Sequence, residues 1–148
     1  MIRSLLLSLL FLSMICGCGK KGPPEPPELT APSAVKGFML IGEPDAVVVR
    51  WVAPETNASG EDLGDLAGFY VFRSPVTKGE RAKFEKIADV TLAPDPAIRE
   101  YIYRDTDVKG GVSYDYQVSS YNLDLVEGET EKTIRATFLG EATRIETF

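Results

Sequence analysis

Few side chains in this chain could perform chemistry. The 148 residues include two cysteines, Cys16 and Cys18, and no histidine. Histidine is the most common general base and metal ligand, and a cysteine thiolate is a strong nucleophile. The reactive groups that remain are the two thiols near the N-terminus and the carboxylates and hydroxyls of the rest of the chain.

Both cysteines lie at the end of an apolar N-terminal segment. A single positive charge, Arg3, is followed by an apolar run from Leu5 to Ile15. That length fits the core of a signal peptide, roughly 7 to 15 residues, and is shorter than the ~20 residues of a permanent membrane helix. We therefore expect residues 1–17 to be an export signal that is removed.

The end of this segment resembles the lipobox of bacterial lipoproteins, in which an aliphatic, a variable and a small residue precede an obligatory cysteine. Ile15, Cys16 and Gly17 precede Cys18 in that order. The resemblance implies cleavage after Gly17, a diacylglycerol on the Cys18 thiol and a freed amine open to a further acyl chain. Cys16 is the weaker candidate, because Ile15 would then occupy the small-residue position. Two or more acyl chains anchor a protein durably.

The alternative is that Cys18 is a buried or disulfide-bonded cysteine of the folded domain. Its neighbours are glycines, lysines and prolines, and removal of Cys16 with the signal leaves no second thiol. An intrachain disulfide is therefore not expected. Apart from the covalent lipid, no cofactor and no metal ion is predicted.

Residues 18–32 are predicted to be a tether between the anchor and the domain. Five prolines, at positions 23, 24, 26, 27 and 32, favour extended polyproline II, a spacer of roughly 40 Å at ~3.1 Å per residue. A ligand for proline-binding modules is the alternative use of such a stretch. Lys20 and Lys21 would lie at lipid headgroups.

The charge of the chain argues against nucleic acid as a partner. The formal net charge is −6, and without residues 1–17, whose one charged side chain is Arg3, it becomes −7. Such a surface repels phosphate backbones. The sequence also contains no Gly-rich phosphate loop, nucleophile elbow or spaced set of metal ligands, so we do not expect an enzyme.

Beyond the tether, hydrophobic residues alternate with a period of two, which is typical of half-buried strands. About seven strands are predicted, separated by turn-rich stretches and without an amphipathic helical stretch between them. They lie near residues 35–41, 46–51, 68–73, 84–90, 99–103, 114–121 and 133–138. This pattern predicts an antiparallel immunoglobulin-like β-sandwich over residues 33–139, followed by a C-terminal tail over residues 140–148.

The strands resemble those of a fibronectin type III domain between Pro32 and Leu139. Four motifs carry the resemblance: Trp51 followed by Pro54, the alternating segment Gly68 to Ser74, the turn with Val108 before Tyr114, and Tyr121 followed by Asn122. The resemblance implies that Tyr114 is the tyrosine of a tyrosine corner and that Val108 fills the core below it. The expected structural core comprises Trp51, Phe69, Val71, Tyr114, Tyr116 and Val118.

Sandwich domains act through loops and exposed sheet faces. Leu123, Leu125 and Val126 are expected on the tip of the last hairpin, either as a partner contact or as a cap on the sandwich. Tyr70 and Phe72 face outward and form either an exposed aromatic patch or a surface covered by Tyr121 and the tail. The acidic turns, with Glu61, Asp62, Asp65, Asp105 and Asp107, are expected to be solvated, because a calcium site needs six to eight converging oxygens.

These features predict a cell-envelope lipoprotein that presents one module to a protein or glycan partner. Gly19 is not the aspartate that the lipoprotein family associates with inner-membrane retention, so the resemblance favours the outer membrane, facing the periplasm. Two alternatives stay open. GCGKKGPP resembles the start of small lipoproteins that mature the lipopolysaccharide translocon, and similar sandwiches accompany glycosidases that use paired carboxylates.

Overall fold

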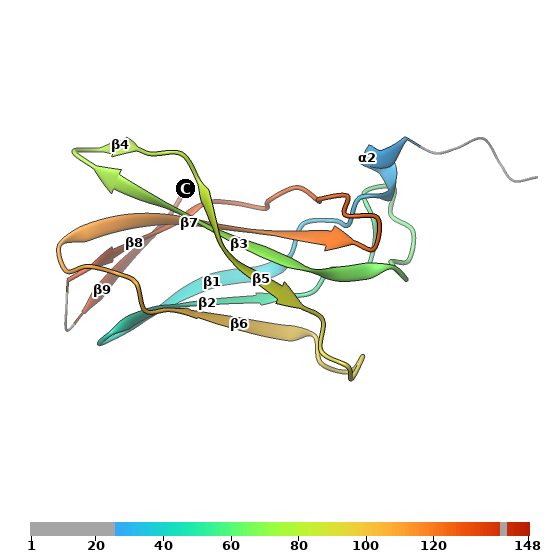
Figure 1. The fold of residues 1–148 in the computed structure, drawn as a ribbon, viewed down its shortest axis with the longest axis horizontal. Helices are drawn as coiled ribbons and strands as arrows, with labels where there is room; N and C mark the ends of the chain where they lie inside the picture. Colours follow the sequence, from blue (N-terminus) through green and yellow to red (C-terminus); the bar gives the residue numbers. More distant parts are fainter. Residues whose placement is uncertain (1–25, 140–141) are drawn as a thin grey trace, which may run out of the picture.

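The structure is a computed structural model that describes residues 26–139 and 142–148 (Figure 1). These residues form one short helix and nine strands: α2 (Pro27–Thr30), β1 (Lys36–Glu43), β2 (Ala46–Val52), β3 (Leu66–Thr77), β4 (Glu80–Arg81), β5 (Glu85–Thr91), β6 (Glu100–Asp105), β7 (Val112–Asn122), β8 (Ile134–Phe138) and β9 (Thr143–Thr147). No helix among them has the length and apolarity to cross a bilayer. The predicted signal peptide, Gly17, Cys18 and most of the tether lie outside the described residues.

The strands form two antiparallel sheets packed face to face (Figure 1). One sheet has the order β1-β2-β6, and the other has the order β4-β3-β7-β8-β9, with β5 also paired to β3. Each pair of neighbouring strands is antiparallel. The prediction of an all-β sandwich is confirmed, and its seven expected strands correspond to β1, β2, β3, β5, β6, β7 and β8.

Alternating apolar side chains fill the space between the sheets. Trp51 of β2 is fully buried, with Phe69 of β3 edge-on at 5.5 Å and Tyr101 of β6 stacked at 6.1 Å between ring centroids. Burying an aromatic side chain removes a large apolar area from water, and such ring pairs add to that stabilisation. The other expected core residues, Val71, Tyr114, Tyr116 and Val118, are buried in the same cluster.

The predicted extended tether ends earlier than Pro32. Residues Pro27–Thr30 form one helical turn, in which the Leu29 amide donates to the Pro26 carbonyl at 2.9 Å. Proline is compatible with the first position of a helix, because an N–H group at that position would have no acceptor within the helix. Ala31 and Pro32 are buried, and Pro32 bridges to Asn57. The expectation of polyproline II over residues 27–32 is therefore wrong, and the packed domain begins near Ala31.

The C-terminal tail contains a strand. Thr143–Thr147 form β9, which pairs along β8 with Ile145 opposite Ala136. β9 also packs against β1 at Gly42, where a Cβ atom would overlap the side chain of Thr143. The segment TRIET reads as a strand, because Thr, Ile and Thr are β-branched and recur at every second position.

Candidate functional site at the β7–β8 loop

The expected contact loop follows β7 and projects from one end of the sandwich. Leu123 is 72% exposed and Leu125 is 69% exposed, whereas Val126 is half-buried. The Leu123 amide donates to the Asp65 carbonyl at 2.9 Å, which ties the loop to the segment before β3. Of the two outcomes that the sequence left open, the two leucines do not cap the sandwich, and Val126 does so in part.

Asn122 holds this loop in one conformation. Its side chain is buried, and its Oδ1 atom accepts a hydrogen bond from the Val126 amide at 2.9 Å. Its Nδ2 atom donates to Asp65 Oδ2 at 3.3 Å. Leu125 has a φ of 62°, a left-handed conformation that this bonding maintains. These hydrogen bonds fix the backbone that carries the two leucines.

The N-terminal segment packs directly beside the loop. Ser120 Oγ donates to the Ser33 carbonyl at 2.9 Å, and Gly128 leaves room for the Pro32 carbonyl, which a Cβ atom would overlap. Between the two segments lies an open groove of about 550 Å³. Its lining includes Ala31, Pro32, Ala34, Ala58, Val126 and Glu129.

The end of the domain that carries the groove is acidic. Loops 55–65 and 122–132 together contain eight carboxylates and one lysine. Glu127 accepts a hydrogen bond from Ser119 Oγ at 2.6 Å, and the Glu61 carboxylate accepts one from Asn57 Nδ2 at 3.3 Å. The exposed leucines thus lie within a negatively charged surrounding.

The outward aromatic residues are partly covered. The rings of Tyr70 and Tyr121 stack with 4.3 Å between their centroids, and Lys86 Nζ lies 4.0 Å from the centroid of the Tyr70 ring. Phe72 is half-buried and meets Tyr70 edge-on at 6.3 Å. Burial and a 2.7 Å hydrogen bond to Asp89 raise the pKa of Tyr121 to about 12. Tyr121 therefore covers Tyr70, whereas the tail lies elsewhere, with Phe148 against Arg135.

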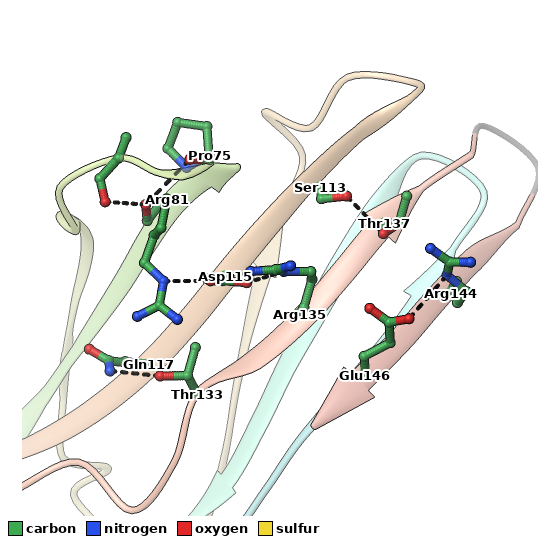
Figure 2. A network of polar contacts seen from close by, with 12 residues as sticks. Pro75, Arg81, Ser113, Asp115, Gln117, Thr133, Arg135, Thr137, Arg144 and Glu146 are labelled. Atoms are coloured by element: carbon green, nitrogen blue, oxygen red, sulfur yellow. Dashed lines mark hydrogen bonds and ion pairs between the residues drawn. The ribbon is translucent and has the colours of Figure 1, made fainter. Parts of the chain in front are cut away.

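A polar network that the sequence did not suggest lies on the same outward face (Figure 2). Asp115 is fully buried between two arginines: Arg135 Nε lies 2.6 Å from its Oδ1 atom and Arg81 Nε lies 2.7 Å from its Oδ2 atom. Burial opposes ionisation of Asp115, but the hydrogen bonds from Arg135 and Arg81 outweigh it and lower its pKa. Each arginine also lies against a ring, Arg81 against Phe84 and Arg135 against Phe148.

The expectation that the acidic turns are solvated is wrong for Asp105, which is buried because Arg73 and Tyr116 satisfy its carboxylate. Asp105 binds Arg73 and accepts a hydrogen bond from the Tyr116 hydroxyl at 2.7 Å, and Asp107 binds Arg73 at 2.9 Å. The Tyr114 hydroxyl accepts a hydrogen bond from the Lys109 amide at 3.2 Å, the backbone contact of a tyrosine corner. Within residues 26–139 and 142–148, no group of three or more acidic, histidine or cysteine side chains is arranged to hold a metal ion.

Comparisons with known proteins identify the fold. No protein-family model and no curated protein sequence matches the chain. The fibronectin type III domain derived from human KIAA0970 protein matches with a TM-score of 0.55 and 18% identity, covering 87% of this chain and 93% of that one. The third fibronectin III domain of human KIAA0343 protein matches with a TM-score of 0.53 and 14% identity, covering 84% of this chain and 96% of that one.

Two longer proteins contain a similar domain. The twitchin kinase region from C. elegans matches with a TM-score of 0.55 and 14% identity, and a β-1,2-glucanase from Parabacteroides distasonis with 0.52 and 18%. These matches cover 77% and 79% of this chain but only 18% and 14% of the longer ones. At these identities the likeness concerns the fold and not the activity. The described part of the chain is a β-sandwich with the fibronectin type III-like fold.

Proposed function

We propose that the chain is a cell-envelope lipoprotein that presents a fibronectin type III-like module to a protein partner. In this proposal Cys18 carries the diacylglycerol after cleavage behind Gly17, and the outer membrane is the site of anchoring, with the module in the periplasm. The observation that carries the interaction role is the exposure of Leu123 and Leu125, each by more than two-thirds, on a loop that Asn122 holds by hydrogen bonds. Two neighbouring leucines on an ordered loop leave apolar area available for a partner.

A protein partner is favoured over a glycan by the chemistry of the surface. Glycans are commonly bound by exposed aromatic faces, but the ring of Tyr70 is occupied by Tyr121 and Lys86. The leucines and the groove supply apolar contact, and the surrounding carboxylates favour basic groups on the partner. The proposed partner therefore has apolar side chains framed by lysine or arginine.

Ala31 and Pro32 line the groove, and the predicted tether joins the domain at these residues. In the proposed arrangement the binding end is thus the one nearer to the anchor. A membrane-associated partner fits this geometry better than a freely diffusing one.

Photocrosslinking in the native host tests the contact. A photoreactive residue at position 125 should trap a protein, whereas the same residue at position 102 should not. Ile102 is a matched control because it is 62% exposed but lies on the outward face of the other sheet. Equal products at both positions would contradict the proposed contact.

Labelling with a palmitate analogue tests the anchor separately. The wild type should incorporate the label and Cys18→Ala should not. Equal labelling of the two would overturn the lipoprotein assignment, whatever the crosslinking result.

A further inference from the structure

β9 has a free edge. The order of the larger sheet ends at β9, and among the described residues no strand pairs with its other side. The Phe148 amide donates to the Thr133 carbonyl at 3.2 Å and the Leu139 amide to the Ala142 carbonyl at 2.8 Å. Because hydrogen-bonding direction alternates along a strand, residues 142, 144, 146 and 148 point their backbone groups toward β8. The N–H and C=O groups of Thr143, Ile145 and Thr147 therefore point outward.

The side chains of β9 are complementary to those of a second, antiparallel β9. When the segment TRIET is laid against itself about Ile145, Thr143 lies opposite Thr147 of the other copy and Arg144 lies opposite its Glu146. The residues with outward backbone groups then face one another as hydrogen-bonded pairs, each donating and accepting. We infer that β9 is a self-association edge, through which two copies of this chain join their larger sheets about a two-fold axis.

Charge supports this register. Along one row of the outward face, Asp115 lies opposite Arg135, and Arg135 lies opposite Glu146 (Figure 2). Pairing about Ile145 places Arg144 of the second copy next in that row, so that the signs continue to alternate. Opposite charges in direct cross-strand pairs stabilise a sheet, and like charges destabilise it.

The charged groups of β9 are also free to rearrange. The side chains of Arg144 and Glu146 are 67% and 42% exposed, and a 3.5 Å contact joins them to each other. An exposed contact of this kind contributes little, so a cross-strand partner can replace it. No buried ion pair has to be broken when the second copy binds.

The free edge of β6 offers a weaker alternative. Pairing β6 with itself about Ile102 would place Glu100 opposite Arg104 of the other copy. Both charges are already engaged within the chain, Glu100 with Arg50 at 2.6 Å and Arg104 with Glu43 at 2.7 Å. A second copy would compete with these contacts, so β9 is the favoured edge.

The inferred dimer is weak. A five-residue strand buries less than the ~1,200 to 2,000 Å² of a standard stable interface, so association should depend on protein concentration. Its symmetry makes it suitable for a disulfide test, because Ile145 faces its own counterpart. Facing residues in an antiparallel pair lie within reach of a disulfide bond.

The experiment compares Ile145→Cys with Ile102→Cys in the full-length protein in its host, under mild oxidation. Ile145→Cys should give a covalent dimer on a non-reducing gel, whereas Ile102→Cys and the wild type should not. Adding Arg144→Glu should reduce the dimer about tenfold, since it replaces two attractive pairs with repulsive ones. Adding Glu146→Arg as well should restore the dimer in part. The reversed charges again face their opposites across the interface, but the new guanidinium lies opposite Arg135 of β8.

The thermal unfolding midpoint of each charge variant should equal that of the wild type, since substitutions at these exposed positions should leave folding intact. A loss of dimer then reflects the interface and not unfolding. Three results would overturn the inference: no more dimer from Ile145→Cys than from Ile102→Cys, no loss of dimer with Arg144→Glu, or no recovery in the double reversal. A dimer formed through Ile102→Cys alone would assign self-association to β6 instead.

Discussion

Arg73 in β3 forms an ion pair with the carboxylate of Asp105 in β6 and so links the two sheets. Arg73 Nη1 lies 3.0 Å from Oδ1 and 2.9 Å from Oδ2 of Asp105, whose side chain is 3% exposed. Burial opposes the charge on Arg73, but hydrogen bonds to Asp107 and Asp105 outweigh it and raise the pKa of the guanidinium. The Tyr116 hydroxyl donates a further hydrogen bond to Asp105, and burial raises the pKa of that phenol.

Asp105→Ala should therefore destabilise the domain strongly. It leaves the Arg73 charge and the Tyr116 hydroxyl without their acceptor in a nearly buried place, which costs about 3 to 5 kcal/mol in the free energy of unfolding. Asp107→Ala is the matched control, because Asp107 binds the same arginine but its side chain is 80% exposed. Urea denaturation should show a loss for the control of less than about 1 kcal/mol. Similar losses for both variants would contradict the role given to Asp105.

Gly128→Ala should loosen the N-terminal segment from the contact loop. A Cβ atom at position 128 would overlap the Pro32 carbonyl, which is backbone and is held by the bridge between Pro32 and Asn57. Overpacking of this kind typically costs about 1 to 3 kcal/mol. Gly64→Ala is the control, since no atom lies within 4 Å of the added methyl group.

Thermal unfolding should give a clearly lower midpoint for Gly128→Ala and an unchanged or slightly higher one for Gly64→Ala, because alanine restricts the unfolded chain. If the proposed contact also depends on this packing, the crosslink from position 125 should weaken in Gly128→Ala at a temperature where the domain remains folded. Equal midpoints for the two variants would show that Pro32 is not held where the structure places it.

The strands could be predicted because burial on one face imposes a period of two. In β2, Val47, Val49 and Trp51 alternate with outward residues, and all three are fully buried. β9 was not predicted, although its β-branched residues alternate with charged ones, because it is short and its one large apolar side chain, Ile145, is 39% exposed. The structure identifies this strand by the pairing of Ile145 with Ala136 and by the contact of Thr143 with Gly42. Both contacts depend on tertiary structure.

The polar contacts of Asp115 could not be predicted from the sequence for a related reason. Alternation in β7 places Asp115 on the outward face of the sheet, yet the residue is fully buried. Arg81 of β4 and Arg135 of β8, which lie 34 and 20 positions away, cover it from the two sides of β7. Period-two patterns report which side of a sheet a residue faces, but not which long side chains fold over it.

Asp115 should make the domain sensitive to acid. Its pKa in the folded state is lowered from the ordinary value of 3.8, so its stabilising contribution is present above that value and is lost as the pH falls through the folded pKa. Asp115→Asn removes this titration. The variant should be less stable than the wild type at neutral pH, and the difference should shrink below about pH 4. Urea midpoints measured across the acid range test this, and parallel pH profiles would contradict it.

Tyr121 should make the domain sensitive to alkali in the opposite sense. Burial and the hydrogen bond to Asp89 raise its pKa to about 12, whereas an unfolded tyrosine titrates near about 10. The stability that this shift contributes is fully present below about pH 10 and is lost as the pH rises toward the folded pKa. Tyr121→Phe keeps the ring that stacks on Tyr70 but removes the phenol.

The phenolate absorbance of the wild type should therefore contain a late phase near pH 12 that is smaller by one tyrosine in Tyr121→Phe. Asp89→Asn should keep the phenol but move its titration to lower pH, since the neutral amide no longer opposes a negative charge on Tyr121. The two variants separate the loss of a group from a shift in its pKa. A late phase unaffected by either substitution would mean that Asp89 does not hold the Tyr121 hydroxyl, and that the cover over Tyr70 is less fixed than the 2.7 Å contact indicates.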